Sequence, residues 1–128
     1  MKILGIGVDV INNQRIKSLI KNKSFIKRVF GKNELKLSTK IKNKSNYFAK
    51  RFAAKEAFAK AMGTGFRNNL EFKDIEILNN KIGKPYYLKS KKINKIINNL
   101  FKIKDYNLFL SISDEKNCSI AFTILEKK

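Results

Sequence analysis

Residues 45–65 read SNYFAKRFAAKEAFAKAMGTG, and this stretch decides the fold that the sequence predicts. Alanine, which has the highest helical propensity of all residues, recurs throughout it. The closing Gly63-Thr64-Gly65 is a typical helix stop, because glycine readily adopts the left-handed conformation found at helix ends. We therefore predict a helix from about Ser45 to Met62. At about 100° per residue its apolar side chains cover much of the circumference, so we expect it in the centre of the core.

Strand-like segments occur at both ends of the chain. Residues 3–11 place β-branched side chains on one side and two glycines with Asp9 on the other, following the two-residue period of a strand. Residues 106–113 and 118–125 also alternate, and the four residues between them predict an antiparallel hairpin. Asp9 therefore lies on a strand face that another part of the backbone can approach closely.

The rest of the chain predicts smaller elements. We expect helices over 15–20, 25–30 and 90–101, strands over 70–78 and 86–88, a turn over 83–85, and an irregular basic segment over 32–43. The predicted fold class is α+β, with a small, mostly antiparallel sheet packed against the long central helix. The length of 128 residues suits a single domain over residues 1–128.

Charge is the most prominent feature of the composition, with a formal net value of +19. It favours association with nucleic acid, a membrane surface or an acidic protein, without choosing among them. Lysine and asparagine are scattered along the whole chain, so a coding bias explains much of the charge equally well. No apolar run approaches the roughly 20 residues of a membrane span. The start lacks a secretion pattern and Cys118 is the single cysteine, so we expect a cytoplasmic protein.

Asp9, Glu56 and Lys60 are the candidate catalytic residues. A carboxylate in a largely buried, alanine-rich helix is costly unless it is paired or bound to a metal. One interpretation is an ion pair between Glu56 and Lys60, which are four residues apart on the helix. The other is that Asp9 converges on Glu56, because two hard oxygen ligands suit Mg²⁺ bound to phosphates. The residues alone leave both interpretations open.

Two glycine-containing segments are weak signals when taken alone. Gly63-Thr64-Gly65 follows a helix, whereas a phosphate-binding loop precedes one, so it does not fit that motif. Gly83-Lys84-Pro85 is typical of a turn.

Taken together, the ordered motifs identify a family resemblance. They are Gly5-Ile-Gly-Val-Asp9, Arg51-Phe-Ala-Ala-Lys-Glu-Ala57, Ala61-Met-Gly-Thr-Gly65, Gly83-Lys-Pro85 and Leu110-Ser-Ile-Ser113. In order, spacing and chain length they resemble the holo-acyl-carrier-protein synthases, the small-subunit 4'-phosphopantetheinyl transferases. The resemblance covers nearly the whole chain and implies the fold of that family.

The resemblance also implies a reaction. Asp9 and Glu56 would hold magnesium against the pyrophosphate of coenzyme A, and Lys60 would stabilise charge on the phosphates. A serine of an apo acyl carrier protein would attack the β-phosphoryl group, and 3',5'-ADP would leave. Positioning and electrostatics dominate such transfers, so a metal, lysines and backbone donors suffice. Glu56 or a metal-bound water would take the serine proton.

Further site residues follow from the resemblance only. The residues that look like coenzyme A contacts are Arg51, Lys55, Lys60, Gly63, Thr64, Gly65, Lys84, Pro85 and Ser113. Arg15 resembles a contact to the acyl carrier protein. Family members are typically homotrimers with sites between neighbouring subunits. Many members have a histidine where this chain has Asp114, so a phosphate contact is not expected at that position.

Two other classes of function remain to be weighed. A nucleic-acid binder would use the net positive charge, but the sequence has no zinc-ligand spacing and no aromatic RNA-binding motif. A purely structural interaction protein would leave Glu56 as a core ion pair. Because acyl carrier proteins are acidic, they explain a basic surface without nucleic acid, and we expect neither nucleic acid nor membrane as a partner.

Overall fold

Helix α4, Lys44–Met62, runs through the middle of the molecule in the computed structural model, which describes residues 1–67 and 69–128. The Asn43 side chain accepts a hydrogen bond from the backbone N–H of Asn46 and so caps its start. Gly63 ends the helix with a φ of 79°, a left-handed conformation that suits glycine. Buried side chains lie on all its sides, so the predicted central helix is confirmed.

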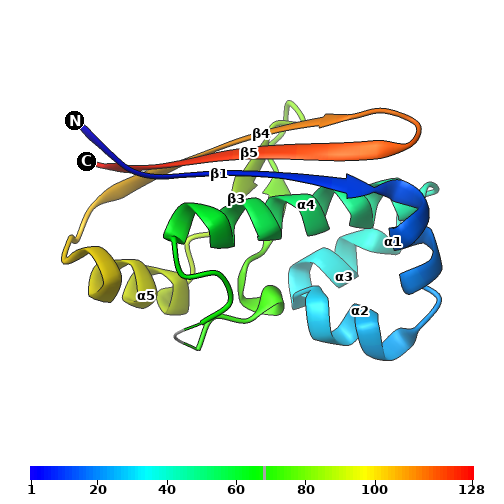
Figure 1. Cartoon of the computed structure of the whole chain (residues 1–128). Helices are drawn as coiled ribbons and strands as arrows, with labels where there is room; N and C mark the ends of the chain where they lie inside the picture. The colour runs from blue at the N-terminus through cyan, green and yellow to red at the C-terminus, as the bar shows by residue number, and fades with distance from the viewer. Residues whose placement is uncertain (68) are drawn as a thin grey trace.

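Two antiparallel sheets accompany this helix. The elements are β1 Lys2–Asn12, α1 Asn13–Leu19, α2 Lys23–Val29, α3 Lys32–Ser38, α4, the 3₁₀ turn η1 Phe72–Asp74, β2 Ile77–Asn79, β3 Pro85–Tyr87, α5 Lys91–Phe101, β4 Tyr106–Asp114 and β5 Cys118–Lys127. The larger sheet has the order β1-β5-β4, and β2 pairs with β3 in the smaller one. Figure 1 shows the larger sheet along one side of α4, with α2 and α3 at one end and α5 at the other. This arrangement confirms the α+β prediction.

Strand β1 lies against the backbone of α4 through its glycine face. A Cβ atom added to Gly7 would lie 1.8 Å from the carbonyl oxygen of Ala57, and one added to Gly5 would lie 1.8 Å from that of Ala61. Only glycine permits this approach. Asp9 follows on the same face of β1, which brings its carboxylate to the surface of α4.

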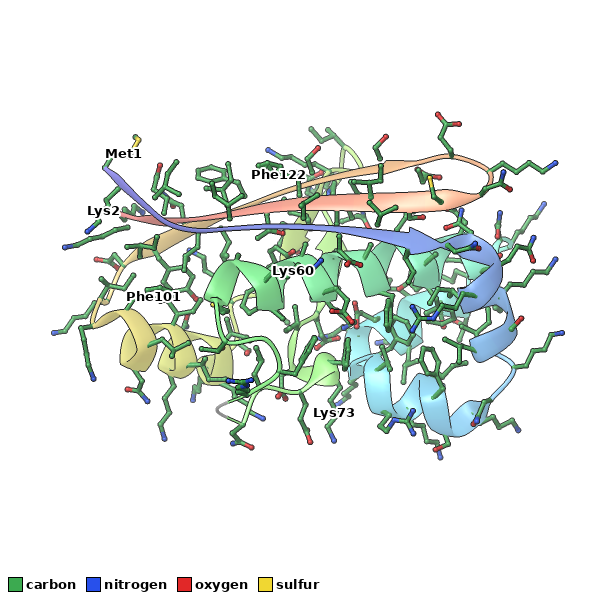
Figure 2. All side chains as sticks on the ribbon, viewed as in Figure 1. Met1, Lys2, Lys60, Lys73, Phe101 and Phe122 are labelled. Carbon is green, nitrogen blue, oxygen red and sulfur yellow. The ribbon has the colours of Figure 1, made fainter. Side chains whose placement is uncertain are left out.

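The opposite face of the larger sheet is uncovered. Ile6, Val8 and Val10 of β1 are 58%, 52% and 61% exposed, and Phe122 of β5 is 39% exposed. Figure 2 shows Phe122 on the side of the sheet that faces away from α4. A contiguous apolar patch of this kind is typical of a surface that binds another protein chain.

Two predictions from the sequence are wrong, and both involve contacts between distant parts of the chain. Residues 32–38 form helix α3 instead of an irregular segment. The Glu76 carboxylate caps α3 by accepting hydrogen bonds from the backbone N–H groups of Asn33 (2.8 Å) and Glu34 (3.2 Å). The partner of this cap lies more than 40 residues away, so local patterns do not reveal it.

The expected strand over 70–78 shortens to β2, and η1 takes the place of its first part. The carbonyl oxygens of Phe72 and Ile75 accept hydrogen bonds from the Lys55 ammonium instead of joining a β-ladder. None of the helices in the described ranges is long and apolar enough to cross a membrane.

Replacement of Gly7 by alanine tests the contact between β1 and α4. We expect Gly7→Ala to lower the free energy of unfolding by about 3 kcal/mol or more, because its methyl group collides with the α4 backbone. Urea denaturation measures this change. As a control, Gly63→Ala has open space around the added Cβ and should lose only about 1 kcal/mol to left-handed strain. Equal losses in the two variants would show that the close contact does not limit the side chain at position 7.

Candidate active site

Asp9 and Glu56 converge at the contact between β1 and α4. Asp9 extends from the glycine face of β1, and its side chain is 15% exposed. Glu56 is half-buried on α4, one residue before Ala57, the residue whose carbonyl oxygen contacts the face of Gly7. The two carboxylates lie near enough for the charge of Asp9 to act on Glu56.

Lys60 binds Asp9 and not Glu56. Its ammonium lies 3.1 Å from the Asp9 carboxylate and also donates a hydrogen bond to the carbonyl oxygen of Val8 at 3.0 Å. Figure 2 shows Lys60 between the ribbons of β1 and α4. No ion pair joins Lys60 to Glu56 in the described part of the chain, so the interpretation of Glu56 as the partner of Lys60 is wrong.

Glu56 is left with an unpaired carboxyl group in a partly buried position. Burial raises the pKa of Glu56, and the neighbouring Asp9 carboxylate raises it further. The positive charges of Lys60 and of Arg15 on α1 lower the pKa of Glu56 in part. A carboxyl group with a raised pKa and no hydrogen-bond partner among the described residues is able to bind a cation or accept a proton.

The two carboxylates fit a magnesium ion and do not fit a site made only of protein ligands. Mutual repulsion between Asp9 and Glu56 would be relieved by a divalent cation between them. No group of three or more acidic, histidine or cysteine side chains gathers among residues 1–67 and 69–128. Magnesium typically takes one or two carboxylates and completes its coordination with water and substrate phosphates, so a pair of carboxylates is sufficient.

Arg51 lies on a different side of α4 from Glu56. The two residues are five positions apart, which at about 100° per residue separates them by roughly 140° around the helix. Arg51 helps to line a pocket of about 130 Å³ together with Lys50, Asn79, Gly83, Pro85, Ile112 and Asp114. Whole-ligand pockets usually measure about 300 Å³ or more, so this pocket suits only part of a large ligand.

The guanidinium of Arg51 is buried without a counterion. The residue is 5% exposed, and it forms no ion pair with any carboxylate in the described ranges. It stacks on the ring of Tyr47 at 3.7 Å and donates to the Asn79 side-chain oxygen at 2.5 Å, while its Nε finds no partner among the described atoms. Because arginine stays charged, this group is suited to bind an anion.

Lys55 is placed differently from the other expected contacts. Its side chain is completely buried and forms an ion pair with the equally buried Glu34, 2.6 Å away. The resemblance implied a coenzyme A contact here, whereas Lys55 is enclosed by α3, η1 and β2. Burial lowers the pKa of Lys55, and Glu34 opposes this effect.

The remaining expected contacts lie at exposed or half-exposed positions. Gly63-Thr64-Gly65 follows α4 one turn after Lys60, but the N–H groups of Gly63 and Gly65 already bond to carbonyl oxygens of α4. Lys84 is exposed next to the pocket, Pro85 lines it, and Ser113 is exposed on β4. Asp114 also lines this pocket, and its carboxylate accepts a hydrogen bond from the Asn46 side chain at 2.7 Å.

Asn79, Asn46 and Glu34 are site partners that the sequence analysis missed. Each is distant in sequence from the residue that it binds, namely Arg51, Asp114 and Lys55. No motif or spacing in the chain pairs them. The only available signal was that buried charges on α4 require partners, which does not identify those partners.

Comparison with known proteins identifies the family of the chain. A family model described as 4'-phosphopantetheinyl transferase superfamily matches residues 5–111. The chain is 59% identical over 128 residues to the holo-[acyl-carrier-protein] synthase of Pelagibacter ubique, with 100% of each chain covered.

Solved structures of named enzymes have the same fold. The holo-[acyl-carrier-protein] synthase of Neisseria meningitidis matches with a TM-score of 0.89 at 38% identity, covering 98% of this chain and 99% of that one. A holo-(acyl-carrier-protein) synthase from Bacillus anthracis in complex with CoA (3',5'-ADP) matches with a TM-score of 0.83 at 33% identity, with both chains covered completely.

The raised pKa of Glu56 predicts a stability effect that depends on pH. A carboxyl group with a raised pKa in the folded state favours folding while it is protonated, and this contribution is lost as the pH rises through that pKa. Glu56→Gln removes the penalty of the buried charge. We therefore expect Glu56→Gln to have a higher Tm than the original protein at pH 7.5, and a Tm difference that shrinks below about pH 4.3, the ordinary pKa of glutamate.

Thermal denaturation at both pH values measures this difference. Glu115→Gln is the matched control, because Glu115 is an exposed carboxylate in the β4–β5 hairpin. It should change the Tm little at either pH. A lower Tm for Glu56→Gln at neutral pH would mean that the Glu56 carboxylate stabilises the fold and is not held at a cost.

Proposed function

The chain belongs to the 4'-phosphopantetheinyl transferase superfamily, and we propose that it is a holo-acyl-carrier-protein synthase. The reaction transfers 4'-phosphopantetheine from coenzyme A to a serine of an apo acyl carrier protein and releases 3',5'-ADP. The observation that carries this proposal is the convergence of Asp9, Glu56 and Lys60 at the glycine face of β1. No comparison supports the nucleic-acid-binding alternative, and the basic surface is explained by an acidic carrier protein.

Asp9 and Glu56 are the residues that would hold magnesium in this proposal. When bound, the ion supplies positive charge to the pyrophosphate of coenzyme A, where negative charge accumulates during phosphoryl transfer. Lys60 adds a fixed cation beside Asp9, and its 54% exposed side chain leaves the ammonium accessible to a phosphate. Lys60 therefore orients the substrate and stabilises the charge that develops on it.

Glu56 is also the protein group best suited to accept the proton of the attacking serine. Its carboxyl group has no hydrogen-bond partner among the described residues, which leaves it able to accept a proton. Arg15 lies near Glu56 on α1, at the edge where a carrier protein would approach. Arg15, Lys17, Lys21, Lys27 and Arg28 give α1, α2 and their connection a positive surface that attracts an acidic partner.

The coenzyme A contacts divide between two sides of α4. Arg51 and Pro85 line the pocket beside β2, β3 and β4, and Lys84 precedes Pro85, while Asp9 and Glu56 face β1. Ser113 lies on the face of β4 that points away from α4. One coenzyme A molecule would reach both groups if they came from neighbouring subunits. The uncovered apolar face of the larger sheet supports a subunit interface, and we propose that the protein is a homotrimer with its sites between subunits.

A transfer assay tests the proposed reaction. The protein is incubated with coenzyme A, magnesium and an apo acyl carrier protein, and the mass of the carrier is followed. We expect the carrier to gain phosphopantetheine, and Asp9→Ala, Glu56→Ala and Lys60→Ala each to lower kcat by about 100-fold or more. Lys95→Ala is the matched control, because it removes an exposed lysine on α5. No mass gain with several carriers would refute the assignment.

A complementation experiment tests the shared site. Asp9→Ala and Arg51→Ala each remove one side of the proposed site, so each variant alone should be inactive. If sites form between subunits, mixed oligomers of the two variants should regain measurable activity. Failure of the mixture, with subunit exchange verified by mass spectrometry, would place both sets of residues in one chain.

A charged residue on the uncovered sheet face tests the interface itself. We expect Val10→Lys to turn the oligomer into monomers and to reduce transfer by about tenfold or more, because a buried unpaired charge opposes association. Light scattering during gel filtration measures the mass. Asn99→Lys on α5 adds the same charge at an exposed position elsewhere and should leave the oligomer intact. A monomeric original protein with full activity would contradict the trimer.

A further inference from the structure

The ion pair between Lys55 and Glu34 is a completely buried pair of charges that the proposed reaction does not use. Both side chains are 0% exposed, and the ammonium and carboxylate lie 2.6 Å apart. A buried ion pair is weak evidence for stability, because apolar side chains of similar volume often stabilise a protein equally well. The pair therefore needs an explanation other than stability.

All hydrogen-bond donors of Lys55 are occupied inside the protein. An ammonium has three donors, and those of Lys55 are directed at the Glu34 carboxylate, the carbonyl oxygen of Phe72 (3.0 Å) and the carbonyl oxygen of Ile75. Direct contact with a substrate would require the side chain to leave these acceptors and the core. Lys55 thus holds the chain segment that enters β2 at a defined position on α4.

Glu34 holds the other side of the same segment. One carboxylate oxygen accepts the N–H of Gly31 at 3.0 Å, and the other accepts the N–H of Ile77, the first residue of β2, at 3.0 Å. Its backbone carbonyl accepts the hydroxyl of Tyr47 at 2.7 Å. The pair therefore connects α3, α4 and β2 through hydrogen bonds to charged groups, which are stronger and more directional than neutral ones.

Tyr47 and Asn79, the two side chains that contact the Arg51 guanidinium, are both connected to the Lys55–Glu34 ion pair. The Arg51 guanidinium stacks on the ring of Tyr47, 3.7 Å from the ring centre. The hydroxyl of the same ring donates a hydrogen bond to the backbone carbonyl of Glu34. Asn79, which accepts from Arg51 at 2.5 Å, lies two residues after Ile77 in β2. A shift of Glu34 or of the start of β2 would thus move both supports of the guanidinium.

We propose that Lys55 and Glu34 are positioning residues that hold Tyr47 and β2 so that the Arg51 guanidinium faces the pocket that receives coenzyme A. This inference rests on the proposed function for its ligand. The open Nε of Arg51 and its lack of a counterion are the features that the pair preserves. Lys55 would then act on the reaction through Arg51, without touching the substrate.

A double variant separates positioning from folding. Lys55→Met alone leaves the Glu34 charge buried without a partner, which is strongly destabilising. Lys55→Met combined with Glu34→Gln removes both charges, so much of the stability should return. In this double variant we expect the KM for coenzyme A and the Kd for 3',5'-ADP to rise on the order of tenfold, as when a group that orients a ligand-binding side chain is removed. We expect kcat at saturating coenzyme A to change much less.

The matched control uses a second ion pair on the same segment. Lys92 of α5 lies 2.6 Å from Asp74 of η1, but this pair does not contact Arg51, Tyr47 or Asn79. Lys92→Met should leave the KM for coenzyme A and the Kd for 3',5'-ADP unchanged. A tenfold weakening in this control as well would show that any change near η1 disturbs the pocket, and would overturn the specific role of Lys55.

A measurement without ligand keeps the inference separate from the proposed function. The Nε–H signal of Arg51 in a ¹H–¹⁵N spectrum, identified by its loss in Arg51→Lys, should move in the double variant and stay in place in Lys92→Met. If the original protein does not bind 3',5'-ADP, the proposed function fails while this signal still tests the inference. A folded double variant with an unchanged Arg51 signal and an unchanged Kd would refute the positioning role.

Discussion

The contact between the backbones of β1 and α4 is the constraint on which the rest of the structure depends. Gly5 and Gly7 remove the side chains that would separate the strand from the helix, and the added Cβ atoms would lie only 1.8 Å from helix carbonyl oxygens. With a larger residue at either glycine the strand would lie farther from α4, and Asp9 would lose its contact with Lys60 and its proximity to Glu56. The same close packing that closes the core therefore creates the carboxylate site.

The charged residues of helix α4 lie on different sides of the helix, and each side has different surroundings. Glu56 and Lys60 face β1, where one carboxyl group has no partner among residues 1–67 and 69–128 and one ammonium is accessible. Arg51 points toward the second sheet without a counterion in the described part of the chain, and Lys55 is neutralised by Glu34 inside the core. A single helix thus carries the proposed metal-binding, anion-binding and positioning residues on different sides, and in the proposed trimer a substrate would reach the first two from two copies of the chain.

Much of the fold was predictable because its signals are local. The alanine-rich stretch up to Met62, the alternating pattern before Asp9 and the hairpin before Cys118 all appear in the structure with nearly the expected bounds. The errors over residues 32–43 and 70–78 have a common cause. The Glu76 carboxylate caps α3, and the Lys55 ammonium takes the carbonyl oxygens before β2, so in both places a distant side chain decides the backbone conformation.

By itself the sequence determined the family, the position of the central helix and the residue types of the candidate site, because motif order, helical propensity and glycine placement are properties of neighbouring residues. Only the tertiary structure decided which charges meet. Spacing along one helix made Glu56 the expected partner of Lys60, yet the ammonium binds Asp9 across the contact with β1. The shared motif likewise could not show that Lys55 is buried and paired while Glu56 is not. Burial and pairing depend on segments that lie against α4 but are distant from it in sequence.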